Sequence, residues 1–416
     1  MKNKKGSSIV LLAMVFVTMA ACISASIGLA RALVVKSECN TFGKLWARAI
    51  LSEYDVHLIE DYGIMAYYGN EIEVQKRINS YLLYSCDSKL DARISDAEAF
   101  LSGYELNDPN NFQSSLKKIQ LNSLVDSVVN AEGRTNREKP EDNAGSRKIA
   151  NEVVIDTLPS KGIDNTLNID TLVKYVKDGK SIESILKKLS NTALDITYMY
   201  KYLNSYMRVT GDKVTYFNNE WEYVIAGKLD DHANYNACRK RLFLLRNALN
   251  LAALYEDRTK VETIAAIAEI LTPGAGAVTQ VAIAEAWAAV ETEEDLKDLY
   301  AGERVPLFKT GPDWKTDLNM ALSDEEKEKV KDLIATSEES TSEIETMSEG
   351  LDYEEYLLIM LSSMNENTRV LRIMDIIQVN MKYRYYDDFN MSEYYVGVDF
   401  YINANGRQYE IKDRYK

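Results

Sequence analysis

The sequence predicts a mainly helical α+β protein, in which a long N-terminal membrane-spanning helix carries a large exported domain that ends in a β-hairpin. Three observations predict this fold class. An uncharged apolar run covers residues 7–30. Apolar residues recur every three to four positions through most of the chain that follows, which is the spacing of helices with one buried face. Near the C-terminus, Asn405-Gly406 separates two alternating segments, and this dipeptide is the preferred turn of a two-residue hairpin.

The N-terminal segment has the composition of a membrane anchor with a short leader. Residues 1–6 include three lysines, and the 24 residues from Ser7 to Ala30 carry no charge. As a helix this run would be about 36 Å long, enough to cross a bilayer with some tilt. Positively charged flanks favour the cytoplasmic side. We therefore expect residues 1–6 in the cytoplasm, residues 7–30 in the plasma membrane, and the bulk of the chain outside the cell.

The processing of this segment has alternatives. A basic start, an apolar stretch and small residues also fit a cleaved secretion signal. Met19-Ala20-Ala21-Cys22 resembles a lipobox, in which Cys22 would be lipidated and the residues before it removed. Lipoproteins normally continue with a polar tether, whereas residues 23–35 stay largely apolar. The sequence favours a retained helix and leaves lipidation at Cys22 as the alternative.

Small residues recur at four-residue spacing within the apolar run. Ala21 is followed by Ala25, and Ser24 by Gly28. This spacing allows two membrane helices to approach closely. The four residues are therefore a candidate helix-packing face. Alanine and serine are also common in membrane helices, so the spacing can equally reflect ordinary composition.

The helical pattern continues beyond the membrane. The recurring apolar residues are Phe42, Leu45, Trp46, Ala49, Ile50, Tyr54 and Leu58, and Tyr62-Gly63 ends the pattern. We expect one helix that runs from lipid into the outer domain as far as about Tyr62. Residues 31–129 are then the helix continuation and a small α+β region, with extended structure in 85–106 and a helix in 111–129.

The rest of the chain is predicted to be a flexible linker and one main domain. Residues 130–148 are polar and lack periodic apolar residues, which is typical of a linker. Residues 149–416 form the main helical domain with the C-terminal β-hairpin. Its predicted elements are helices in 166–209 split near Asn191-Thr192, helices in 231–300 with a turn at 272–277, a hairpin in 213–227, a solvated helix and loop in 322–350, and a long helix or helix pair in 353–381.

The register of the C-terminal hairpin can be counted outward from its turn. Ile402 then pairs with Tyr409 and Phe400 with Ile411, whereas Tyr401 pairs with Glu410 and Asp399 with Lys412. The first two pairs lie on one face and the other two on the opposite face. One face is therefore apolar, and the other sets an acidic residue opposite a basic one.

Composition excludes several classes of function. The chain has 64 acidic and 49 basic residues and a net charge of -15, and such a surface repels nucleic acid. Its two histidines are not in zinc-protease spacing, its four cysteines form no CxxC pair, and neither a P-loop nor a Gly-x-Ser-x-Gly elbow is present. The charges at Asp230-Asp231 and Glu293-Glu294-Asp295 are interpreted as helix starts. We expect no nucleic-acid partner, no metal, no cofactor and no catalytic residue.

The layout of the N-terminus resembles a known family. A lysine-rich leader, Gly6-Ser7, an apolar run and an amphipathic continuation together resemble the type IV pilin-like subunits, in particular the TadE/TadG-like pseudopilins of Tad pilus systems. The resemblance implies that a prepilin peptidase cuts between Gly6 and Ser7 and that the helices pack into a filament or membrane complex. Most members have a glutamate five residues after the cut, where this chain has Leu11.

A second resemblance covers most of the exported chain. Its segments are Ser52-Glu53-Tyr54, Asp61-Tyr62-Gly63-Ile64, Asn219-Glu220-Trp221-Glu222-Tyr223-Val224-Ile225-Ala226-Gly227, Arg241-Leu242-Phe243-Leu244-Leu245-Arg246, Val305-Pro306-Leu307-Phe308-Lys309 and Tyr353-Glu354-Glu355-Tyr356-Leu357. They are similar to an uncharacterised family of large TadE/TadG-like proteins of Gram-positive bacteria. The resemblance implies a non-catalytic structural or assembly component of a Tad-like surface apparatus, with other pilus or pseudopilin subunits as partners. A surface-anchored enzyme or ligand-binding protein that acts on cell-wall or extracellular material is the alternative.

Overall fold

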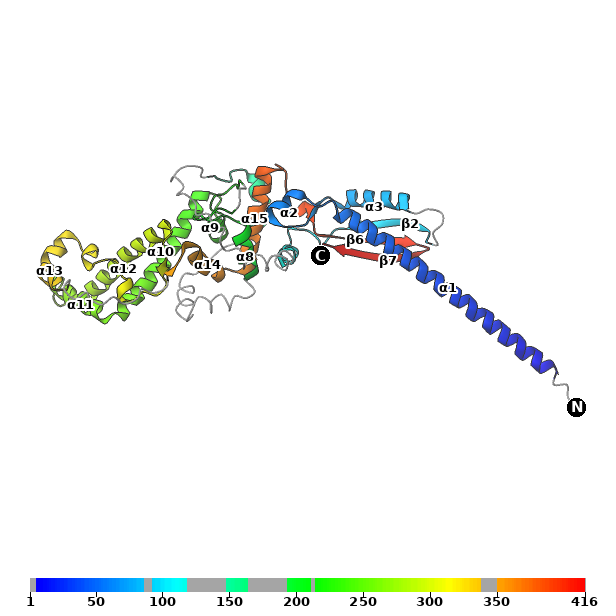
Figure 1. Ribbon diagram of the computed structural model, residues 1–416, viewed down its shortest axis with the longest axis horizontal. Coiled ribbons are helices and arrows are strands. Elements are labelled where there is room, and N and C mark those ends of the chain that lie inside the picture. Colours follow the sequence, from blue (N-terminus) through cyan, green and yellow to red (C-terminus); the bar gives the residue numbers. More distant parts are fainter. Residues whose placement is uncertain are drawn as a thin grey trace. The chain divides into compact units, whose positions relative to one another are not determined.

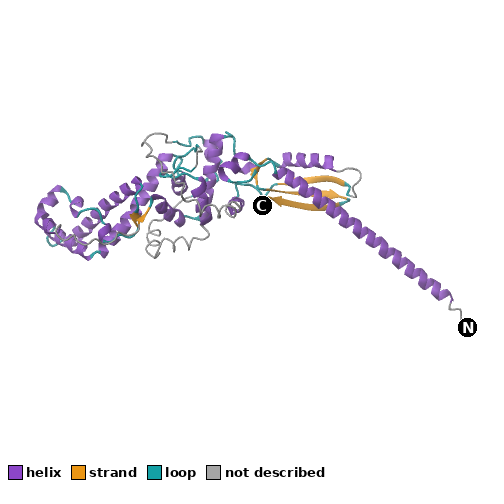
Figure 2. Ribbon diagram, in the orientation of Figure 1, coloured by secondary structure: helices purple, strands orange, loops and turns teal. Residues whose placement is uncertain are grey.

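The computed structural model describes residues 5–85, 92–117, 147–163, 193–210, 214–337 and 350–415. The chain divides into two compact units. Unit 1 contains Met1–Ile119 and Asp388–Lys416, and unit 2 contains Gln120–Asp387. Figure 1 labels the elements, and Figure 2 shows that helices predominate and that the longest strands belong to unit 1. The predicted fold class is confirmed: a mainly helical α+β protein with a long N-terminal helix and a C-terminal hairpin.

The N-terminal helix α1 covers Lys5–Leu51 without a break. The prediction that it continues to about Tyr62 is wrong, because the chain turns after Leu51 and a separate helix, α2, covers Val56–Tyr62. Asp55 caps α2 by accepting a hydrogen bond from the Leu58 amide at 2.9 Å. Backbone contacts from this turn to residues 66 and 67 compete with helix continuation, and they prevail over the helical spacing of the apolar residues.

Unit 1 contains a three-stranded antiparallel sheet in the order β2 (Ile94–Phe100), β6 (Gly397–Ala404) and β7 (Arg407–Arg414). All four predicted hairpin pairs are present in the register of β6 and β7. Asn405 and Gly406 have φ angles of 50° and 72°, as the expected turn requires. The strand expected within 85–106 is β2.

The prediction that the hairpin belongs to the helical domain at 149–416 is wrong. Its first strand, β6, pairs along β2, and residues 388–416 cluster with residues 1–119. Pairing of strands far apart in the sequence leaves no signal in local periodicity. The sheet therefore joins the C-terminus of the chain to the N-terminal unit.

One face of the sheet is covered by helices. The second half of α1 and the helix α3 (Glu71–Ser85) pack on it. Trp46 stacks on Phe400 with ring centroids 6.4 Å apart. Gly43 lets α1 lie close to the sheet, because a Cβ atom at this position would stand 2.5 Å from Cγ1 of Ile411. A two-residue pair of strands, β1 (Tyr67–Tyr68) and β5 (Tyr394–Tyr395), completes the unit.

Unit 2 is helical. Its described elements are α5 (Glu152–Asp156), α8 (Ala193–Tyr202), α9 (Glu220–Ala226), α10 (Asp231–Glu256), α11 (Arg258–Leu271), α12 (Gly276–Ala301), β3 (Val305–Pro306), α13 (Asp324–Ser337), β4 (Gly350–Leu351), α14 (Tyr353–Ser363) and α15 (Glu366–Arg384). The helices expected in 231–300, the turn within 272–277, the acidic helix in 322–350 and the helix pair in 353–381 are confirmed.

The hairpin expected in 213–227 is wrong, because the segment from Glu220 to Ala226 is the helix α9. Every residue of α9 is buried. Its aromatic and branched residues reflect burial on all sides, which periodicity cannot distinguish from a buried strand. Residues 109–117 are helical, as expected for the start of 111–129. The linker at 130–146, the helix expected in 166–190 and the loop at 338–349 lie outside the described residues.

Candidate functional site

The first half of α1 exposes a continuous apolar surface. Every residue from Ile9 to Arg31 is exposed, including Leu12 at 72% and Phe16 at 75%. Apolar side chains in water cost roughly 25 cal/mol per Å² of exposed surface, so this segment requires another environment. Among the described residues, α1 is the one helix long and apolar enough to cross a membrane.

The second half of the same helix belongs to the core of unit 1. Buried positions begin at Val35 and recur at Cys39, Gly43, Trp46 and Ile50. Two hydrogen bonds fix this half laterally: Trp46 Nε1 donates to Ser85 Oγ at 3.1 Å, and Glu38 Oε2 accepts from the Ala92 amide at 3.0 Å. One unbroken helix therefore carries the exposed apolar surface and supports the sheet.

The residues predicted as sites in α1 all lie on its free half. Gly6 and Ser7 lie in its first turn. Ala21, Cys22, Ser24, Ala25 and Gly28 are exposed, and a Cβ atom built on Gly28 meets nothing within 4 Å. Of the cysteines that the structure describes, Cys22 is exposed, and Cys39 and Cys238 are buried. The helix passes through Cys22 without interruption. Cleavage after Gly6, lipidation at Cys22 and helix packing all remain predictions.

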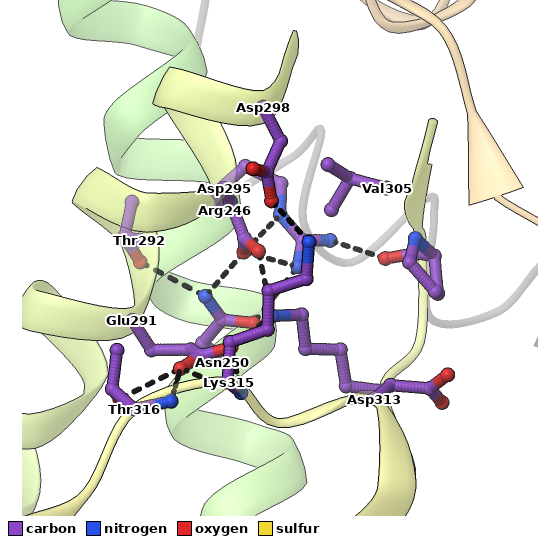
Figure 3. Close-up of polar contacts among 12 residues, drawn as sticks. Arg246, Asn250, Glu291, Thr292, Asp295, Asp298, Val305, Asp313, Lys315 and Thr316 are labelled. Atoms are coloured by element: carbon purple, nitrogen blue, oxygen red, sulfur yellow. Dashed lines mark hydrogen bonds and ion pairs between the residues drawn. The ribbon is translucent and has the colours of Figure 1, made fainter. Parts of the chain in front are cut away.

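A buried ionic network lies at the centre of unit 2 (Figure 3). Arg246 of α10 and Asp295 of α12 are both fully buried, and Nη2 of Arg246 lies 2.7 Å from Oδ2 of Asp295. Lys309, which follows β3, lies 2.6 Å from the other oxygen of Asp295 and also pairs with Glu291 of α12. The two cations and two anions balance in charge, which burial demands.

Neutral groups complete the network. The Arg246 guanidinium also donates to the carbonyls of Pro306 and Leu307 at 2.8 and 3.0 Å and to the Tyr356 hydroxyl at 3.0 Å. Thr316 donates to Glu291 from its amide at 2.9 Å and from its hydroxyl at 2.7 Å. Asn250 and Thr292 bond to each other beside Asp295. The network thereby joins α10, α12, α14 and the segment 305–316.

Two buried carboxyl groups lie elsewhere in unit 2. Glu222 of α9 accepts hydrogen bonds from the Tyr353 hydroxyl at 2.8 Å and the Tyr206 amide at 3.0 Å. Loss of hydration on burial raises the pKa of Glu222 to about 7. Asp375 of α15 accepts from the Tyr223 hydroxyl and the Ser160 amide, both at 2.9 Å, and burial raises its pKa to about 6. Both side chains bridge helices and are shielded from solvent.

Sequence reasoning did not identify these buried groups. Asp230 does cap α10 as expected, with a 2.8 Å bond from the Ala233 amide. The interpretation of Glu293-Glu294-Asp295 as helix-start charges is wrong, because all three residues lie well inside α12, and Asp295 is buried. The available signal was the set of segments quoted above: 219–227, 241–246, 305–309 and 353–357 supply Glu222, Arg246, Lys309 and Tyr356. Among the described residues, no cluster of histidine, cysteine and acidic groups is suited to hold a metal ion.

Comparisons with known proteins give one match. Residues 103–406 match a family described as "Family of unknown function (DUF5702)". The matched region includes the whole ionic network and excludes α1. No curated protein matches the chain, and no solved structure matches it.

Proposed function

The chain belongs to the DUF5702 family of unknown function, and we propose that it is a non-catalytic structural or assembly component of a Tad-like surface apparatus. Its N-terminal helix anchors it in the plasma membrane with the leader in the cytoplasm, and its acidic units lie outside the cell. Its partners in this proposal are other pilus or pseudopilin subunits.

The observation that carries the proposal is that α1 belongs both to the apolar N-terminal segment and to the core of unit 1. Its first half exposes an apolar surface long enough to span a bilayer, and its second half is the central support of a sheet. Because unit 1 shares a continuous helix with its anchor, it cannot rotate freely about a hinge at the membrane surface. This arrangement suits a subunit that must hold a defined orientation in an assembly, and it agrees with the resemblance of the leader and apolar run to pilin-like subunits.

The buried polar groups support a structural role for unit 2. Arg246, Asp295, Lys309 and Glu291 are almost completely removed from solvent, and each forms an ion pair with at least one of the others. Glu222 and Asp375 have the raised pKa values that general acids use, but both are buried and bonded to tyrosine hydroxyls of neighbouring helices. Groups in these positions stabilise the packing of helices and do not face a substrate.

Gentle detergent extraction followed by affinity purification tests the proposal. The full-length chain should retain pilus or pseudopilin subunits encoded in the same cell. A variant with Ala25→Leu and Gly28→Leu stays apolar and should remain in the membrane, but its bulky side chains should reduce retention of partners. Leu12→Ala, which lies off this face, is the matched control. Recovery of the wild-type chain without other pilus components would refute the proposal.

Mass spectrometry of the mature N-terminus tests its processing. A chain that begins at Ser7 has been cut as a prepilin. A chain that begins at a lipidated Cys22 is a lipoprotein, which would remove the proposed helical anchor. A chain that retains Met1 is held by an uncut helix. This single measurement separates the three forms.

A further inference from the structure

The sheet of unit 1 has one covered face and one open face. Side chains alternate along its strands, so Ala97, Phe400 and Ile411 face α1 and α3 and are buried. The intervening residues face away from the helices, and the acidic members are Asp96 and Glu98 of β2, Asp399 of β6 and Glu410 of β7. We call this open side the outer sheet face.

The outer sheet face is acidic around an aromatic pair. Phe100 and Tyr401 meet edge to face with centroids 5.4 Å apart, and both are half-buried. Two basic residues of β7 offset part of the negative charge. Lys412 places its ammonium 2.7 Å from Glu410 and 3.5 Å from Asp399, and Arg414 is exposed on the same face. Asp96 and Glu98 form no ion pair within the part of the chain that the structure describes. Their charges are therefore available to an incoming surface.

The opposite side of unit 1 carries the reverse charge. The part of α1 that packs on the sheet turns Lys44, Leu45 and Arg48 away from it, and all three are exposed, Leu45 by 59%. Residues three and four apart share one side of a helix, so Arg48 lies beside both Leu45 and Lys44. Neither cation takes part in an ion pair with any described residue. We call these three residues the basic helix face.

The membrane does not explain the basic helix face. With the apolar run ending at Ala30, a rise of about 1.5 Å per residue places Lys44 about 21 Å and Arg48 about 27 Å further along the helix. Electrostatic attraction to anionic headgroups decays over a Debye length of about 8 Å at physiological salt. Both residues therefore lie beyond the reach of the lipid surface, and a protein surface is the fitting partner.

We infer that the basic helix face of one copy of this chain docks on the outer sheet face of a second copy. Leu45 then packs against Phe100 and Tyr401, while Lys44 and Arg48 meet Asp96 and Glu98. An apolar centre with a charged rim is the usual anatomy of a protein interface. The inference rests on the proposed function in one respect: both copies must be anchored in the same membrane with the same orientation.

The two faces lie on opposite sides of one unit, which determines the type of assembly. A contact between different surfaces of identical chains is heterologous, and it leaves one face of each type free at the ends. Further copies can add in the same way, so the contact produces a row or a filament and not a closed pair.

Charge reversal with differently tagged full-length chains tests the inference. Variant one carries Lys44→Glu and Arg48→Glu, and variant two carries Asp96→Lys and Glu98→Lys. Each variant alone should lose about tenfold in co-purification of its other-tagged copy from detergent-solubilised membranes, because like charges meet. A mixture of the two variants should recover the wild-type level, because opposite charges then meet in both directions. The acidic helix face of variant one meets the basic sheet face of variant two, and the basic helix face of variant two meets the acidic sheet face of variant one. Lys76→Glu with Lys240→Glu is the control for variant one, because it makes the same change in net charge away from both faces.

A cysteine pair gives a second readout that does not depend on net charge. Leu45→Cys with Tyr401→Cys should form disulfide-linked ladders under mild oxidation, because the two positions point in opposite directions within one chain. Leu45→Cys alone is the control. Failure of the mixed variants to recover association, or absence of the ladder in membranes where the wild-type chain self-associates, would overturn the inference. Loss of other pilus subunits with the ladder intact would instead contradict the proposed function.

Discussion

The ionic network of unit 2 predicts that two arginines of the same helix contribute very differently to stability. Arg246 and Arg239 both lie on α10, and each pairs with a carboxylate of α12 at 2.7 Å. The Arg246–Asp295 pair is fully buried, whereas the side chains of Arg239 and Glu293 are 43% and 45% exposed. Replacing either arginine by leucine breaks one ion pair between the same two helices, so the comparison sets a buried, hydrogen-bonded arginine against a partly exposed one.

The cost of Arg246→Leu follows from the groups that it leaves behind. Lys309 remains between Asp295 and Glu291, so a net negative charge is buried. The carbonyls of Pro306 and Leu307 lose the donor that Arg246 supplies. Removing one partner of a buried pair costs about 3–5 kcal/mol. Arg239→Leu breaks an exposed pair, which contributes about 0–1 kcal/mol.

Urea unfolding followed by tryptophan fluorescence measures both variants. Trp221, Trp287 and Trp314 lie in unit 2, whereas Trp46 lies in unit 1, so the signal reports mainly on the helical unit. We expect the free energy of unfolding to fall several times more for Arg246→Leu than for Arg239→Leu. Adding Asp295→Leu should recover part of the loss, because Lys309 and Glu291 then balance.

Equal effects of the two substitutions would refute this account of the network. The same holds if the double variant is less stable than Arg246→Leu alone, because the buried charge imbalance would then not be the cause of the loss. Far-ultraviolet circular dichroism of each variant before unfolding confirms that helices are retained and that the comparison concerns the same folded state.

Three further predictions concern single residues. Folding raises the pKa of Glu222 from 4.5 to about 7. Between these pH values the unfolded chain loses its proton first, so the free energy of unfolding should fall by about 3 kcal/mol as pH rises across this window and then level off. Glu222→Gln should flatten that part of a profile of urea midpoint against pH. Gly43→Val should destabilise unit 1 by about 1–3 kcal/mol, because the valine side chain would overlap Ile411. Amide hydrogen exchange in β6 and β7 measures the loss. The control is Gly28→Val, which has open space around it and should leave the exchange rates unchanged. Gly406→Ala should cost about 1 kcal/mol by the same readout, since φ is 72° there; an unaltered exchange rate would contradict a strained turn.

Local chemistry predicted much of this fold. The Asn405-Gly406 turn sets the hairpin register by counting, because a two-residue loop leaves one arrangement of the following pairs. The start of α10 follows from the capping carboxylate of Asp230, and the α11–α12 turn follows from its proline and glycines. Each of these features depends on residues within a few positions of one another, so a single sequence is sufficient.

The errors involve contacts between distant residues. Pairing of β2 with β6 depends on strands about 300 residues apart in the chain, and no periodicity records it. Helix α9 is buried on all sides, so its composition resembles that of a strand. Asp295 stands beside two exposed acids in sequence but faces Arg246 in space. The segments that resemble a known family did mark the buried centre, although they could not indicate which side chains meet.

The limits of the family match differ from those of the folded units. Residues 103–406 include β6 but exclude β2, all of β7, and α1. A fragment with these limits would lack both strands that β6 pairs with and the helix that covers them, whereas the helices of unit 2 lie wholly inside the match. The packing of unit 2 therefore uses elements inside the match, whereas the sheet also needs elements outside it. Helix α1, the candidate membrane span, is thus also a structural part of unit 1. A substitution such as Gly43→Val should disturb the sheet and leave the apolar first half of the helix unchanged.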